Sequence, residues 1–179
     1  MIHPDIESVL ITEAELKARV AAMAAEIRGG MGQTAPMLIG VLKGSFVFMA
    51  DLARALDRDC EIDFMAVSSY GANTESSGKT MILKDVGQSV EGRDVTVVED
   101  ILDSGNTLSR IMALLKTRKP RSLKLCVLLD KPERRKVKIE ADYVGFTVPD
   151  SFIVGYGLDY AERYRCLPYI GILKPDIYS

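Results

Sequence analysis

A strand-like run that passes through carboxylates into a helix start is the feature that most constrains this chain. Val95–Glu99 has the β-branched character of a buried strand, and Asp100 follows directly. A third acid, Asp103, precedes the small residues 104–107, and helical spacing begins in Leu108–Thr117. Free N–H groups and the dipole at a helix start attract phosphate, while carboxylates suit sugar hydroxyls and hard metal ions. The stretch therefore predicts a strand-loop-helix unit that holds a phosphate, a sugar and a metal.

Strands and helices alternate along the rest of the chain. Expected helices span 13–28, capped by Thr12 and stopped by Gly29-Gly30, then 46–56 and 108–117. Expected strands span 37–42, 60–68, 81–84, 95–99, 123–129, 142–146 and 152–154. This order predicts an α/β fold with a mostly parallel central sheet flanked by helices. The length suits a single domain over residues 1–179.

Three polar segments follow predicted strands of this sheet. Lys43-Gly44 comes after 37–42, residues 99–107 close the strand at 95–99, and Asp130-Lys131 comes after 123–129. Ligands of open α/β sheets bind outside the carboxyl ends of the strands. We therefore expect the three segments to converge on one site.

Composition and single residues exclude several classes of protein. There are 23 basic and 25 acidic residues, a net charge of −2, so no overall field favours nucleic acid. No apolar run approaches the roughly 20 residues of a membrane span, and the N-terminus does not resemble a signal peptide. The only histidine, His3, argues against a Ser-His-Asp triad or a histidine-rich zinc site. A divalent metal would be held by oxygen, which favours Mg²⁺, and three scattered cysteines favour a cytoplasmic location.

Each of these motifs also has a plainer interpretation. Asp103-Ser-Gly is a common helix cap, and Glu99-Asp100 alone could be a solvated strand end. The loop has no lysine, so it is not a Walker A loop, and its residues do not match Gly-x-Gly-x-x-Gly either. Lys131 begins a basic run that ends at Lys138, and Phe152 taken alone suits a protein core. The combination at one strand end, rather than any single residue, favours a functional site.

Residues 97–108, Val-Val-Glu-Asp-Ile-Leu-Asp-Ser-Gly-Asn-Thr-Leu, resemble the phosphoribosyl-pyrophosphate signature of the type I phosphoribosyltransferases. Further segments resemble the hypoxanthine-guanine phosphoribosyltransferases: Leu42–Gly44 their pyrophosphate loop, Leu128–Lys131 their base-recognition segment, and Asp142–Tyr160 with Arg165 their C-terminal hood. The similarity runs in order from about residue 8 to residue 172.

The resemblance implies a type I phosphoribosyltransferase fold with a small hood and a mobile lid. The hood would comprise the N-terminal segment and roughly residues 142–179, and the lid roughly 69–80. The implied reaction transfers ribose 5-phosphate from phosphoribosyl pyrophosphate to hypoxanthine or guanine, giving IMP or GMP and pyrophosphate, with Mg²⁺ as cofactor. It also implies a homodimer or homotetramer without a membrane or nucleic-acid partner. A xanthine-guanine phosphoribosyltransferase, or a non-catalytic regulator that senses phosphoribosyl pyrophosphate, remains an alternative.

By the same resemblance, the signature residues divide between sugar, phosphate and proton transfer. Glu99 and Asp100 would bind the ribose hydroxyls and Mg²⁺, and Asp103 would be the general base at purine N7. The 5′-phosphate would be bound by residues 103–107, which include Ser104, Gly105, Asn106 and Thr107.

The remaining expected site residues lie outside the signature. Lys131 would contact the purine 6-oxo group, Phe152 would stack on the ring, and the Ile153 backbone would contact the base. Asp159 would lie at a second Mg²⁺ near the purine 2-position. Pyrophosphate would be bound by Lys43, Gly44 and Arg165, with a non-proline cis peptide at Leu42–Lys43, and Ser69 and Tyr70 would start the lid.

Overall fold

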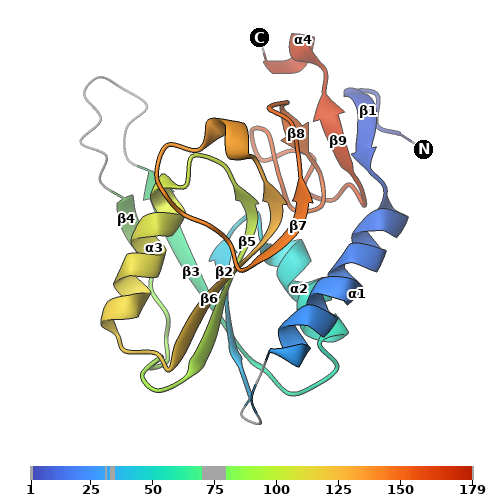
Figure 1. The fold of residues 1–179 in the computed structure, drawn as a ribbon. Coiled ribbons are helices and arrows are strands. Elements are labelled where there is room, and N and C mark those ends of the chain that lie inside the picture. Colours follow the sequence, from blue (N-terminus) through green and yellow to red (C-terminus); the bar gives the residue numbers. More distant parts are fainter. Residues whose placement is uncertain (1, 31, 33–34, 70–79, 179) are drawn as a thin grey trace.

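The computed structural model describes residues 2–30, 32, 35–69 and 80–178 (Figure 1). Its strands are β1 (Ile6–Ile11), β2 (Met37–Leu42), β3 (Glu61–Ser69), β4 (Thr80–Lys84), β5 (Asp94–Leu102), β6 (Ser122–Asp130), β7 (Tyr143–Thr147), β8 (Ile153–Val154) and β9 (Ile170–Leu173). Its helices are α1 (Glu13–Gly29), α2 (Phe46–Ala55), α3 (Asn106–Thr117) and α4 (Pro175–Tyr178), with a 3₁₀ turn, η1, at Pro132–Arg134. No helix in the described part of the chain is long and apolar enough to cross a membrane.

Six strands form the central sheet in the order β4-β3-β2-β5-β6-β7. All neighbours are parallel except β3 and β4, which pair antiparallel. The predicted mostly parallel sheet is confirmed. The carboxyl ends of β2, β5 and β6 therefore lie at one edge, where the three polar segments begin.

The two faces of this sheet are covered by different helices (Figure 1). Leu38, Val98 and Cys126 pack with α1 and α2 in one cluster. The alternate residues, such as Ile39 and Val97, pack with α3 on the opposite face. Strands buried on both sides read as continuous apolar runs, which is why β2, β5 and β6 were recognisable from the sequence.

A second sheet, β1-β9-β8, lies beyond the carboxyl edge of the central sheet (Figure 1). It joins the two ends of the chain, because Ile6 pairs with Leu173 and Ile11 with Ile170, antiparallel. Of its strands, only β8 lies within a strand expected from the sequence. Strand β1 alternates poorly, with two buried residues at its ends and exposed or half-buried ones between, so periodicity did not reveal it.

Two expected boundaries in the signature region were wrong. Strand β5 continues to Leu102 instead of ending at Glu99, because Ile101 and Leu102 keep pairing with Leu129 and Asp130 of β6. Helix α3 begins at Asn106 rather than Leu108. Glu99 and Asp100 thus lie within the strand, Asp103 directly follows it, and the last two residues of the small-residue loop begin the first turn of the helix. The Thr12 cap is confirmed as a capping box with Glu15.

Candidate active site

A cavity of about 270 Å³ opens at the carboxyl edge of the central sheet, between the turn after β2 and the β5–α3 connection. Of the expected site residues, it is lined by Gly44, Glu99, Asp100, Asp103, Ser104, Gly105 and Thr107. Asn106 is exposed and does not line it. Segments separated by more than fifty positions thus meet at one site, as the strand order requires.

The two adjacent acids differ in environment because consecutive strand residues point to opposite faces. Glu99 is buried and Asp100 is half-buried. Burial raises the pKa of Glu99 well above its ordinary value of 4.5, and the nearby Asp100 carboxylate raises the pKa further. A ligand that brings a positive charge to this pair would favour the ionised form of Glu99.

The connection between β5 and α3 is a tight turn built on Gly105. Its φ is +80°, in the left-handed region that glycine tolerates, and a Cβ would lie 2.6 Å from Cγ2 of Ile139. Within the described part of the chain, no side chain caps α3, and the Asn106 amide has a 3.4 Å contact with Ser104 Oγ. The first turn of α3 therefore presents backbone donors beside the acids of β5.

The turn after β2 packs against both the acids and the C-terminal segment. The peptide bond between Leu42 and Lys43 is cis, as the resemblance implies. A Cβ on Gly44 would overlap the Asp100 carboxylate. A Cβ on Gly157 would overlap the Gly44 carbonyl oxygen. Only glycine at both positions allows the three segments to approach this closely.

An ionic group links this turn to the segment after β8. Lys43 Nζ lies 2.9 Å from Glu162 Oε1, and Arg165 Nη2 lies 2.9 Å from Asp159 Oδ1 and 3.3 Å from Glu162 Oε2. Arg165 also donates to the Gly157 carbonyl at 2.8 Å. Its Nε is buried and has no hydrogen-bond partner among the described residues. A buried donor of this kind is costly unless a ligand satisfies it.

A second ionic group lies on the other side of the cavity. Arg134 Nε lies 3.1 Å from Asp103 Oδ1, and Arg134 Nη1 lies 3.3 Å from Asp150 Oδ1. Lys131 is buried, donates to the Ser151 carbonyl at 2.9 Å and lies 3.6 Å from Asp150 Oδ1. Sequence reasoning assigned no role to Arg134 or Asp150, because Arg134 falls in the basic run that reads as a solvated face.

Phe152 is partly exposed and lies in an aromatic group that the sequence did not reveal. Its ring stacks on Tyr178 of α4, with centroids 4.6 Å apart and planes 21° apart. Tyr160 meets the same ring edge-on at 5.3 Å. Ile153, the next residue, is buried in β8 and pairs with Ile172 of β9. The plainer expectation of Phe152 as a core residue does not hold, since 37% of it remains exposed.

Some expected site residues are not brought together. Among the described residues, no three His, Cys, Asp or Glu side chains form a group that could hold a metal ion. Ser69 is the last residue of β3. Tyr70 and the rest of the expected lid up to residue 79 lie outside the described residues.

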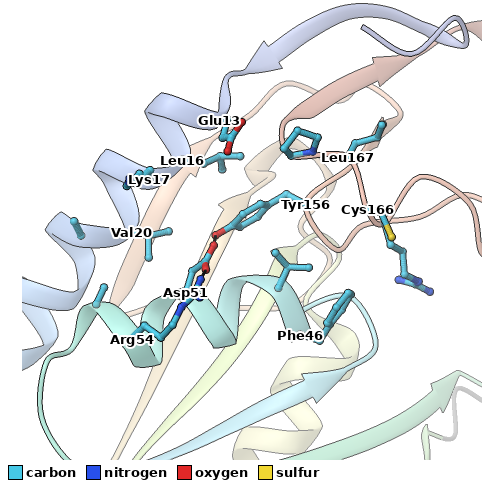
Figure 2. Close-up of a pocket in the computed structure, with 15 residues that line it drawn as sticks. Glu13, Leu16, Lys17, Val20, Phe46, Asp51, Arg54, Tyr156, Cys166 and Leu167 are labelled. Atoms are coloured by element: carbon cyan, nitrogen blue, oxygen red, sulfur yellow. Dashed lines mark hydrogen bonds and ion pairs between the residues drawn. The ribbon is translucent and has the colours of Figure 1, made fainter. Parts of the chain in front are cut away.

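A larger cavity, about 720 Å³, lies between α1, α2 and residues 156–168 (Figure 2). Its walls are mainly apolar, and the Tyr156 hydroxyl donates to Asp51 Oδ2 across it at 2.6 Å. Of the expected site residues that the structure describes, only Arg165 lines this cavity. The residues expected from the sequence to form the site therefore gather at the smaller cavity.

Comparison with known proteins decides which family has this arrangement. Residues 8–161 match the model of the phosphoribosyl transferase domain. The chain belongs to the phosphoribosyltransferase family. The match covers the central sheet and the signature, so the phosphoribosyltransferase fold expected from the resemblance is confirmed.

Individual phosphoribosyltransferases are similar over the whole chain. The hypoxanthine-guanine phosphoribosyltransferase of Bacillus subtilis is 56% identical over 179 residues, which is 100% of this chain and 99% of that protein. A crystal structure of a hypoxanthine phosphoribosyltransferase from Staphylococcus aureus has a TM-score of 0.94 and 50% identity, covering 99% of this chain and 96% of that one.

A third relative is longer. The bifunctional protein TilS/HprT of Listeria monocytogenes is 58% identical over 178 residues. These are 99% of this chain but only 28% of that protein. The chain thus spans somewhat more than a quarter of the length of this bifunctional relative.

Proposed function

We propose that the chain is a 6-oxopurine phosphoribosyltransferase of purine salvage. It transfers ribose 5-phosphate from phosphoribosyl pyrophosphate to hypoxanthine or guanine, giving IMP or GMP and pyrophosphate. The observation that carries this proposal is the cavity at the end of β5, where acids, a helix start and a glycine turn meet. The names of full-length relatives at 49–56% identity support the same reaction.

The donor half of the reaction is assigned to the β5–α3 connection and the β2 turn. Backbone donors at the start of α3, with Ser104 and Thr107, bind the 5′-phosphate, and Asn106 contributes its backbone. The turn at Lys43-Gly44 and Arg165 bind pyrophosphate. The unpartnered Arg165 Nε supports this role, because a phosphate oxygen would satisfy it.

We assign the ribose hydroxyls and Mg²⁺ to Glu99 and Asp100. Their donor set consists of carboxylate oxygens, which Mg²⁺ prefers, and Mg²⁺ commonly takes only one or two carboxylates together with substrate phosphates. When bound, the ion would offset the negative charge of pyrophosphate as it leaves. Asp159 is assigned to a second ion. In the structure its carboxylate pairs with Arg165 and accepts a hydrogen bond from the Glu162 amide.

The acceptor half is assigned to the side chains around Asp103 and Lys131. Asp103 removes the N7 proton as the new glycosidic bond forms. Lys131 donates to the 6-oxo group, which matches hypoxanthine and guanine and mismatches the amino group of adenine. Phe152 stacks on the base and the Ile153 backbone contacts it. Ser69 and Tyr70 begin a lid that excludes water from the reacting sugar.

We further propose that residues 1–179 act as one domain, with a hood formed by β1 and roughly residues 142–179. The protein would act in the cytoplasm as a homodimer or homotetramer. Its three free cysteines suit a reducing compartment.

An assay with phosphoribosyl pyrophosphate, Mg²⁺ and each of hypoxanthine, guanine, xanthine and adenine tests this function. We expect nucleotide to form with hypoxanthine and guanine and not with adenine. Preference for xanthine over hypoxanthine would favour a xanthine-guanine enzyme instead. Binding of phosphoribosyl pyrophosphate without nucleotide formation from any base would favour a regulator that senses this compound.

A further inference from the structure

Arg134 lies between the two side chains that we assign to the purine. It is the last residue of η1, three positions after Lys131. Its guanidinium reaches Asp103 on the β5–α3 connection through Nε and Asp150, before β8, through Nη1. One side chain therefore connects two segments that approach the purine from different elements.

The contacts continue from Asp150 to Lys131. Asp150 Oδ1 is the atom shared by Arg134, at 3.3 Å, and by Lys131 Nζ, at 3.6 Å. Charges thus alternate along a row: Asp103, Arg134, Asp150, Lys131. The row begins at the proposed proton acceptor and ends at the proposed donor to the 6-oxo group.

The two oxygens of Asp103 are not equivalent in this arrangement. Oδ1 is buried and faces Arg134 Nε, although the contact is not aligned as a hydrogen bond. The side chain as a whole is 41% exposed, so its exposed area lies on atoms other than Oδ1. A carboxylate held by one oxygen leaves the second free to accept a proton.

We propose that Arg134 is a positioning residue for the purine half of the reaction. It holds Asp103 through Oδ1 so that Oδ2 faces N7, and it shares Asp150 with Lys131 so that the ammonium group stays available to the 6-oxo group. This inference rests on the function proposed above and deepens it. Without Arg134, Lys131 would be the only cation of the row that pairs with Asp150. No positive charge would then lie between the Asp103 and Asp150 carboxylates.

Arginine suits this position because two of its N–H groups diverge from one rigid plane. A lysine would restore the charge, but a single ammonium group cannot reproduce contacts from two separate nitrogens. Arg134, Asp103 and Asp150 are each more than two-fifths exposed. Exposed ion pairs are individually weak, so the expected effect is moderate.

Steady-state kinetics of Arg134→Ala, Arg134→Lys and the control Lys138→Ala test the proposal. Lys138 is an exposed basic residue of the same run. We expect Arg134→Ala to lower kcat/KM for hypoxanthine about three- to fivefold, while KM for phosphoribosyl pyrophosphate stays within about twofold. Arg134→Lys should recover only part of this loss, and Lys138→Ala should match the unmodified chain.

A double-mutant cycle with Asp150→Asn provides a second, independent measurement. If Arg134 and Asp150 act through one row, the loss in the double variant should be smaller than the product of the two single losses. Thermal unfolding of each variant checks that the fold is retained.

The outcomes separate the two proposals. Unchanged kcat/KM for hypoxanthine in Arg134→Ala, full recovery in Arg134→Lys, or an equal loss for both substrates would overturn the positioning role while leaving the transferase function intact. An unmodified chain that makes no nucleotide would overturn the transferase function itself. If Arg134→Ala does not fold, multiplicative losses in the cycle of Arg134→Lys with Asp150→Asn would overturn the positioning role.

Discussion

Glu99 lies in an environment that suits a ligand but lowers the stability of the fold. Its carboxyl group is buried beside another acid, and none of the described residues that line the cavity with it is basic. Natural proteins keep such groups mainly at functional sites. The folded chain therefore favours the protonated form of Glu99, whereas the unfolded chain releases the proton near the ordinary pKa of 4.5.

This difference predicts a pH dependence of stability. Because the pKa is raised in the folded state, the contribution of Glu99 to stability is complete below the unfolded pKa and is lost as pH rises through the folded pKa. In the absence of metal and substrate, Glu99→Gln should therefore keep more of its stability than the unmodified chain as pH rises above the ordinary pKa of 4.5. Thermal unfolding in the presence of a chelator measures this. Parallel pH profiles for the two proteins would contradict the raised pKa.

At the scale of elements, the site depends on close approach between turns. Gly157 has a φ of +104°, and the Gly44 carbonyl occupies the space where a Cβ would project. The segment after β8 and the turn after β2 meet at this point. Any side chain there must push the two segments apart.

We therefore expect Gly157→Ala to destabilise the fold by about 1–3 kcal/mol and to raise KM for phosphoribosyl pyrophosphate. Gly29→Ala is a matched control, because no atom lies within 4 Å of a Cβ at that position. Urea unfolding and substrate titration provide the two measurements. If both alanine variants behave alike, the contact between the turns does not limit the site.

Helix α4 places the Tyr178 ring against Phe152, which we assign to the purine. Tyr178 stacks on Phe152 and so limits the rotation of that ring. Stacked aromatic pairs contribute roughly 0.5–1.5 kcal/mol. Tyr178→Ala should therefore raise KM for hypoxanthine about two- to tenfold and leave KM for phosphoribosyl pyrophosphate unchanged, while Tyr178→Phe should retain the ring and the affinity. Equal KM values for hypoxanthine in the two variants would argue against this support.

The sequence predicted the central elements better than the hood. Strands β2 and β6 are buried on both faces and appear as unbroken apolar runs, so their positions could be predicted within a residue or so. Strand β1 depends on pairing with β9, more than 150 positions away, and local pattern carries little of that information. The end of β5 was misplaced because an acid pair normally marks a solvated end, whereas β6 continues the pairing beyond it.

The candidate site divides in the same way. The placement of residues 99–107 at the carboxyl edge of the sheet was predictable, because one continuous stretch carries the polar groups. Arg134 and Asp150 were not, since each is an ordinary surface charge until the fold brings it beside Asp103 or Lys131. The burial of Glu99 was also unpredictable, because it depends on the strands on either side.

For the molecule as a whole, the layered packing predicts an order of thiol reactivity. Cys166 is exposed and Cys60 is half-buried. Cys126, on β6, lies in the core on the face of the sheet that α1 and α2 cover. Burial raises the pKa of the Cys126 and Cys60 thiols, which suppresses their reactive thiolate forms. A colorimetric thiol reagent should modify Cys166 first and Cys126 only on global unfolding. Cys166→Ser should remove the fast phase, and early modification of Cys126 would contradict the packing.

The pairing of β1 with β9 also bears on how the protein is made. Strands β2 to β7 can complete the central sheet once residue 147 has emerged from the ribosome. Strand β1 is synthesised first, yet β9, the strand with which it pairs, comes near the end of the described chain. Contacts between residues so far apart form late. During synthesis, therefore, the half that we assign to phosphate binding can be assembled while the half that we assign to the purine still awaits its final strand.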